Sequence, residues 1–149
     1  MRSANRKSIL LDTNILIAYL YQGHPLHESV KQRVLRLQEE GFDLWLAPQC
    51  LYEFYVVATR PTDQNGLGRT PQAAGEHIRE LMALFLFADD PRRIFDKWLQ
   101  LCQDYQVSGR RAHDVRLVAW MVKKGVKDLL TLNPKDFQEF TNIITVHSV

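Results

Sequence analysis

Four acidic side chains in this sequence could hold a metal ion if the fold brought them together: Asp12, Glu53, Asp114 and Asp136. Clustered carboxylates repel one another and raise one another's pKa unless a cation neutralises them. Oxygen ligands without a converging cysteine or histidine favour Mg²⁺ or Mn²⁺ over zinc. Such an ion can polarise a phosphoryl oxygen and lower the pKa of bound water, so the set predicts metal-assisted hydrolysis.

Each acid also has a purely structural interpretation. Asp12 or Asn14 alone would serve as a helix cap, and Asp114 suits the first turn of a helix, where the helix dipole favours an acid. The segment from Asn133 to Asp136 could be only a turn. Glu53 is the exception, because its neighbours in the sequence are apolar. We expect it to be buried, and a buried carboxylate needs a basic partner, a proton or a metal.

Short apolar runs alternate with helical periodicity along the chain. Strands are predicted at residues 8–11, 44–47, 128–131 and 143–146, and helices over 15–21, 26–37, from Pro48, from Thr70, after a cap at Asp89–Asp90, and over 112–124. This alternation predicts an α/β three-layer sandwich, a central parallel sheet with helices on both faces. Residues 60–71 read as a loop within one domain of residues 1–149, and residues 1–7 are expected to be flexible.

The carboxyl ends of parallel strands meet at one edge of the sheet, and ligands bind there. Asp12 follows the first predicted strand, and Thr131, Asn133 and Asp136 follow the strand near 128. Glu53 and Asp114 lie near the starts of helices that leave the same edge. The topology therefore brings the acids together.

Composition excludes several classes of protein. The chain has 149 residues, 46% hydrophobic and 24% charged, with a net charge of +2. These values exclude collagen-like, coiled-coil and disordered chains, and the charge is too small to indicate a nucleic-acid binder by itself. Two cysteines, Cys50 and Cys102, are too few for a disulfide framework and are expected to be buried and reduced. With no predicted membrane span or signal peptide, we expect a cytoplasmic protein.

Four segments resemble, in order, the motifs of PIN-domain ribonucleases, and in particular the VapC toxins of toxin–antitoxin systems. They are residues 9–14 (Ile-Leu-Leu-Asp-Thr-Asn), Glu53, residues 112–119 (Ala-His-Asp-Val-Arg-Leu-Val-Ala) and residues 129–137 (Leu-Leu-Thr-Leu-Asn-Pro-Lys-Asp-Phe). The resemblance implies that Asp12, Glu53 and Asp114 hold Mg²⁺ or Mn²⁺, which activates water against an RNA phosphodiester.

The resemblance also raises a question about the fourth acid. Where the family commonly has an aspartate, this sequence has Asn133, and Asp136 occupies a later acidic position. Because Pro134 can start a short turn, we expect Asp136 to swing back toward Thr131 and to matter more for activity than Asn133. The departure leaves open whether Asn133 or Asp136 completes the site and whether one or two ions bind. The resemblance further implies that Thr131 lies near the metal, with Asn14 supporting the site.

Partners follow from the resemblance more than from the residues. It implies a cognate antitoxin and a homodimer, and the early helices carry more aromatic residues than one core needs (Tyr19, Tyr21, Tyr52, Phe54 and Tyr55). Positive charges that could bind RNA phosphates flank the acids at Arg110, Arg111, Arg116 and Lys135, although these side chains could also be merely solvated.

Other functions fit the sequence less well. A phosphatase of the haloacid-dehalogenase type needs a second acid two residues after Asp12, where this chain has Asn14. Phosphate-binding glycine loops are missing, and His24 and His27 lack a third metal ligand. Two alternatives stay open: a PIN-fold RNA-processing nuclease without a toxin role, and a non-catalytic PIN-like binding module.

Overall fold

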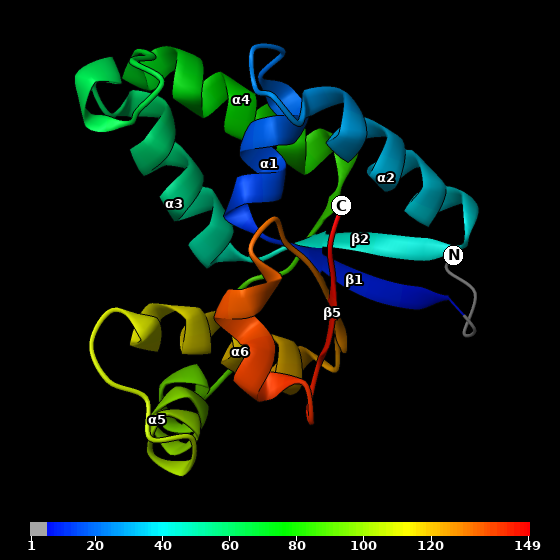
Figure 1. The fold of residues 1–149 in the computed structure, drawn as a ribbon, viewed down its shortest axis with the longest axis vertical. Coiled ribbons are helices and arrows are strands. Elements are labelled where there is room, and N and C mark those ends of the chain that lie inside the picture. The colour runs from blue at the N-terminus through cyan, green and yellow to red at the C-terminus, as the bar shows by residue number, and fades with distance from the viewer. Residues whose placement is uncertain (1–5) are drawn as a thin grey trace.

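The protein is described by a computed structural model, which covers residues 6–149. A five-stranded sheet in the order β3-β2-β1-β4-β5, parallel throughout, forms the centre. In Figure 1, helices α1 to α4 lie on one side of the sheet and α5 and α6 on the other, which confirms the predicted α/β three-layer architecture. The elements run β1 Lys7–Leu11, α1 Thr13–Leu20, α2 His27–Glu39, β2 Phe42–Leu46, α3 Pro48–Thr59, α4 Pro71–Leu84, β3 Leu86–Phe87, α5 Ile94–Asp104, α6 Arg111–Lys124, β4 Asp128–Leu130 and β5 Thr145–His147.

The central strand β1 is buried on both faces. Ile9, Leu10 and Leu11 are fully inaccessible to solvent. Leu11 pairs with Leu130 of β4, and Leu10 pairs with Trp45 of β2. A strand covered on both faces needs a continuous apolar run, which is why residues 8–11 could be recognised in the sequence.

Local signals set most helix boundaries. The Asp12 side chain caps α1 by accepting from the Thr13 N–H at 2.7 Å. Pro48 and Pro71 start α3 and α4, where a missing N–H costs nothing. Helix α6 ends at Gly125, whose φ of 73° is a left-handed conformation that glycine adopts without strain.

Three details of the predicted elements are wrong. Helix α5 begins at Ile94, after Arg93 in a left-handed conformation, so the pair Asp89–Asp90 does not cap it. The two-residue strand β3 was not predicted, and β5 lies two residues later than expected. Of the segment 1–7, Lys7 is the first residue of β1 and Arg6 bonds to Asp43. The rest of the segment 1–7 lies outside the described residues.

Both cysteines are free thiols, and only Cys50 is fully buried, whereas Cys102 is partly exposed. Between residues 6 and 149, no helix combines the length and the apolar character that crossing a membrane would require.

Trp120 of α6 is 1% exposed and is among the largest fully buried side chains. We expect Trp120→Ala to destabilise the fold by about 3–5 kcal/mol, because it leaves a large cavity that the core cannot close. Urea unfolding followed by circular dichroism measures this loss. Phe95→Ala on α5 is the matched control, since Phe95 is 63% exposed and its removal should cost under about 1 kcal/mol. Equal losses in both variants would contradict this view of the core.

Candidate active site at the carboxyl edge of the sheet

Asp12 lies where β1 ends, and both of its carboxylate oxygens are held by the protein. Oδ1 accepts from the Thr13 N–H at 2.7 Å, and Oδ2 accepts from the Thr131 hydroxyl at 2.8 Å. The backbone N–H of Asp12 also bonds to the Leu130 carbonyl, at 3.0 Å, across the neighbouring strand. The carboxylate is therefore fixed in one orientation at the edge of the sheet.

Thr131 and Asn14 connect the ends of β1 and β4. Thr131 is fully buried, and its hydroxyl accepts from the Asn133 N–H at 3.1 Å and the Asn14 amide at 3.3 Å while it donates to Asp12. The Asn14 carbonyl accepts from the Leu132 N–H at 3.1 Å. Thr131 and Asn14 thus form a hydrogen-bonded network behind Asp12.

Glu53 differs from the prediction, because it is exposed. Burial of Glu53 would follow if its apolar neighbours were core residues, but Tyr52, Tyr55 and Val56 are themselves exposed on α3. The Glu53 carboxylate accepts from the Gln49 amide at 2.9 Å and lies close enough to Asp12 to raise its pKa. The prediction that Glu53 is buried is therefore wrong, although Glu53 does lie near Asp12 at the edge of the sheet, as predicted.

Asp114 lies in the first turn of α6, which neighbouring elements hold from several directions. The Trp98 indole of α5 donates to the Ala112 carbonyl at 2.7 Å, and Gln49 of α3 donates to the His113 carbonyl at 2.8 Å. Arg111 donates to the backbone carbonyl of Asp136 at 3.1 Å. These contacts fix the helix start and with it the direction of Asp114.

Asp136, and not Asn133, is the fourth group whose charge reaches the other acids. Pro134–Phe140 forms a 3-10 helix, and the Asp136 N–H bonds to the Asn133 carbonyl at 3.1 Å. This turn brings the Asp136 carboxylate close enough to Asp114 to raise its pKa. Asn133 instead contributes its backbone N–H to Thr131.

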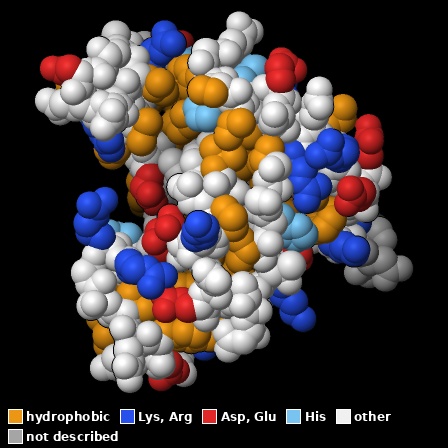
Figure 2. All heavy atoms as spheres, viewed as in Figure 1, with side chains coloured by type: hydrophobic (Ala, Val, Ile, Leu, Met, Phe, Trp, Pro, Cys, Tyr) orange, Lys and Arg blue, Asp and Glu red, His pale blue; other side chains and the backbone are white. Residues whose placement is uncertain are grey.

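The electrostatics of these groups suit a bound cation. The pKa of Asp12 is raised to about 6, chiefly because the carboxyl is buried; hydrogen bonds from Thr131 and Thr13 lower it, and the charges of Glu53 and Asp114 add smaller increases. Burial, Asp136 and Glu53 likewise raise the pKa of Asp114. Figure 2 shows acidic side chains gathered in the notch beneath α3. Within residues 6–149, however, no three carboxylate, thiol or imidazole groups are already arranged tightly enough to enclose an ion. Oxygen donors that repel one another fit Mg²⁺ or Mn²⁺, which would draw them closer.

The basic side chains differ in how free they are. Arg110 and Lys135 are exposed beside the acids. Arg111 pairs with Glu139 at 2.5 Å, and Arg116 pairs with Asp90 at 2.7 Å, so both of these charges are already partly engaged.

His24 lies in the turn before α2 and His27 is the first residue of that helix, and both rings make hydrogen bonds to the backbone. His24 accepts from the Leu26 N–H, and the ring of His27 contacts the Ala18 carbonyl at 2.8 Å. Sequence reasoning missed Gln49, Trp98 and Asp90. Only Gln49 carried a signal, its place one helical turn before Glu53.

The comparison with family models assigns the chain to a family. Residues 9–142 match the model of the PIN domain. The match spans most of the sequence, so this protein belongs to the PIN domain family, and the resemblance seen in its motifs is confirmed.

Several solved structures have a similar fold. VapBC-1 from nontypeable Haemophilus influenzae contains a chain that superposes with a TM-score of 0.69 at 16% identity, covering 95% of this chain and 97% of that chain. A toxin–antitoxin complex from Klebsiella pneumoniae gives 0.61 at 21% identity and covers 95% and 99%. VapC20 from Mycobacterium tuberculosis, described as a sarcin–ricin loop cleaving toxin, gives 0.56 at 19% identity and covers 81% and 86%. These similarities show the fold. A search of curated sequences gives no match.

The raised pKa of Asp12 predicts a stability change that depends on pH. Between its ordinary value of 3.8 and about 6, the folded protein binds a proton that the unfolded chain has lost, so stability falls as pH rises through this window. Ionised Asp12 therefore costs about 3 kcal/mol at neutral pH. Without metal, Asp12→Asn should raise Tm by roughly 5 °C at about pH 8, because the amide removes this cost but loses one hydrogen bond.

Thermal unfolding in EDTA at a series of pH values measures this effect. The gain should vanish below about pH 4.5, where Asp12 is protonated in the folded parent protein. Asp63→Asn, in the exposed 3-10 turn Thr62–Gln64, is the control for a lost surface charge. A gain for Asp12→Asn that did not depend on pH would rule out desolvation of Asp12 as its cause.

Proposed function

We propose that this chain is a metal-dependent endoribonuclease, the toxin of a toxin–antitoxin pair. One observation carries the proposal. The Asp12 carboxylate is oriented by Thr131 at the edge of the sheet where ligands bind, and the charges of Glu53 and Asp114 lie close enough to raise its pKa. The similarity of fold to VapC20, described as a toxin that cleaves the sarcin–ricin loop, supports RNA as the substrate.

In this proposal the chain's own residues orient the reacting groups. Asp12, Glu53 and Asp114 hold Mg²⁺ or Mn²⁺, and Asp136 approaches from the side of Asp114. The ion supplies Lewis-acid polarisation of the phosphodiester and a lowered pKa for attacking water. Thr131 and the Thr13 N–H keep the Asp12 carboxylate turned toward the edge. Arg110 and Lys135 supply exposed positive charge for RNA phosphates on either side of the cut.

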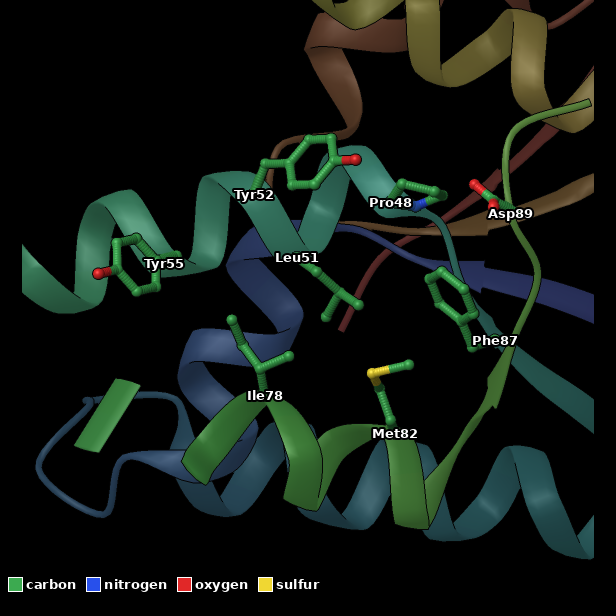
Figure 3. A pocket seen from close by; sticks show the side chains of 8 residues that line it. All are labelled: Pro48, Leu51, Tyr52, Tyr55, Ile78, Met82, Phe87 and Asp89. Atoms are coloured by element: carbon green, nitrogen blue, oxygen red, sulfur yellow. The ribbon is translucent and has the colours of Figure 1, made fainter. Parts of the chain in front are cut away.

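An apolar pocket between α3 and α4 is a suitable place for an antitoxin segment to dock. It has a volume of about 510 Å³, and Figure 3 shows Ile78 and Met82 of α4 pointing toward Leu51 of α3, with Phe87 at one end. Tyr52, which immediately precedes Glu53 on α3, lines the same pocket. Several structures of similar fold are VapBC complexes, and one is described as a toxin–antitoxin complex. Capture of a small co-encoded protein, lost in Met82→Asp, tests this docking.

A homodimer also belongs to the proposal. Exposed Tyr52 and Tyr55 offer apolar surface on α3, the kind of surface that is enriched at interfaces. Light scattering that gave a monomer at micromolar concentration would exclude the dimer. A PIN-fold RNA-processing nuclease and a non-catalytic binding module remain the alternatives, and the four acids on one edge favour catalysis over simple binding.

The purified protein should cleave single-stranded or loop-containing RNA with Mg²⁺ or Mn²⁺ and should stop in EDTA. Asp12→Asn, Glu53→Gln and Asp114→Asn should each lower the rate roughly a thousandfold, because a metal ion contributes several kcal/mol to the transition state. The folded state should survive each change. Asp63→Asn is the matched control and should cleave at the normal rate. Cleavage that persisted after complete removal of metal would overturn the mechanism.

The fourth acid allows a separate comparison. We expect Asp136→Ala to cost about tenfold more activity than Asn133→Ala, because only the Asp136 carboxylate adds charge near Asp114. Part of the loss should return at high Mn²⁺, which compensates for a weaker site. Initial rates over a Mn²⁺ titration measure both effects. The reverse order would mean that the Asn133 side chain faces the ion and that Asp136 only stabilises the turn.

A further inference from the structure

Gln49 connects the two helices that carry Glu53 and Asp114. Its side-chain NH₂ group donates to the Glu53 carboxylate at 2.9 Å and to the His113 backbone carbonyl at 2.8 Å. Glu53 lies one turn further along α3, whereas His113 immediately precedes Asp114 in α6, on the other side of the sheet (Figure 1). One amide group thus holds an acid from one layer and the backbone beside an acid from the other.

The chemistry of the neighbours determines which way this amide points. Both groups that face the Gln49 nitrogen, a carboxylate and a carbonyl, can only accept hydrogen bonds. The group that faces the Gln49 oxygen is the Arg116 guanidinium, which can only donate, with Nη1 at 3.5 Å. Turning the amide over would set oxygen against oxygen and nitrogen against nitrogen. The amide is therefore held in the orientation that presents two donors to the site.

Arg116 is in turn fixed from behind. Its Nη2 donates to the Asp90 carboxylate at 2.7 Å, and the two side chains are 34% and 26% exposed. Asp90 lies in the segment between β3 and α5, so three separate parts of the chain meet at this point. An arginine held in this way is poorly placed to bind an RNA phosphate and well placed to support the Gln49 carbonyl.

We infer that Gln49, backed by the Arg116–Asp90 pair, is a positioning residue that orients the Glu53 carboxylate and the first turn of α6, which carries Asp114, for binding a divalent cation. The inference rests on the proposed metal-dependent function. Glu53 is exposed, so without Gln49 its side chain would sample several rotamers, and only some would face Asp12 and Asp114. Neutral donors orient the carboxylate without reducing the negative charge that attracts the cation.

Mn²⁺ binding to the purified protein without RNA, measured by calorimetry, tests this role directly. We expect Gln49→Ala to weaken Mn²⁺ binding about tenfold, the usual consequence of removing a group that orients a ligand. Gln49→Glu should weaken it less, because the added charge attracts the cation although both donors are lost. Gln72→Ala is the matched control, since Gln72 makes the same one-turn hydrogen bond to Glu76 on α4, at 3.1 Å. It should bind Mn²⁺ like the parent protein.

Kinetics separate positioning from RNA binding. Gln49→Ala should lower kcat about tenfold at limiting Mn²⁺ while KM for RNA stays unchanged, and saturating Mn²⁺ should restore much of kcat. Arg116→Met should act in the same direction but more weakly. If Arg116 bound phosphate instead, the variant would raise KM and reduce its salt dependence, with Mn²⁺ affinity unchanged, and that result would overturn the role given to Arg116.

The outcomes distinguish this inference from the proposed function. A parent protein that bound no Mn²⁺ would overturn both. A parent protein that bound Mn²⁺ and cleaved RNA, with Gln49→Ala equal to Gln72→Ala in Mn²⁺ affinity and in kcat, would leave the nuclease intact and overturn the positioning role of Gln49. Equal Tm values for the two variants show that both are folded to the same extent.

Discussion

The burial and mutual repulsion of the carboxylates at the edge of the sheet form the constraint on which the rest of the site depends. Asp12 is fixed beside Glu53 and Asp114, and burial together with these charges raises its pKa to about 6. The chain offsets part of this cost with hydrogen bonds from neutral donors, the Thr131 hydroxyl and the Thr13 N–H. Because none of these donors carries a positive charge, the edge stays negative and favours a divalent cation.

The sheet and its two helical layers make this crowding geometrically possible. Neighbouring parallel strands β1 and β4 end together, which places Asp12 against Thr131. Helices α3 and α6 approach the same edge from opposite sides of the sheet and bring Glu53 and Asp114. Hydrogen bonds from Trp98 and Gln49 then hold the first turn of α6 in place. The core therefore supplies rigidity, and the polar contacts at the edge supply orientation.

Signals that act within one element could be predicted from the sequence. The apolar run of β1, the prolines that start α3 and α4, and Gly125 after α6 all act locally, and together they place the acids on one edge. Features that depend on distant parts of the chain could not be predicted. The strand β3 is defined by its pairing with β2. The role of Gln49 depends on its contact with His113, 64 residues away in the chain. Glu53 was expected to be buried because apolar neighbours on α3 look alike in sequence whether they face the core or, like Tyr52, solvent.

A crystal of the protein soaked in Mn²⁺, with anomalous scattering collected near the manganese absorption edge, tests directly whether the acids at the carboxyl edge of the sheet bind a divalent cation. We expect an anomalous peak within bonding distance of carboxylate oxygens of Asp12, Glu53 and Asp114, with the Thr131 hydroxyl still bonded to Asp12. The same soak of Glu53→Gln should give a weaker peak. A strong peak elsewhere on the protein, with these three carboxylates unchanged and unliganded, would contradict the assignment of this edge as a metal-dependent active site.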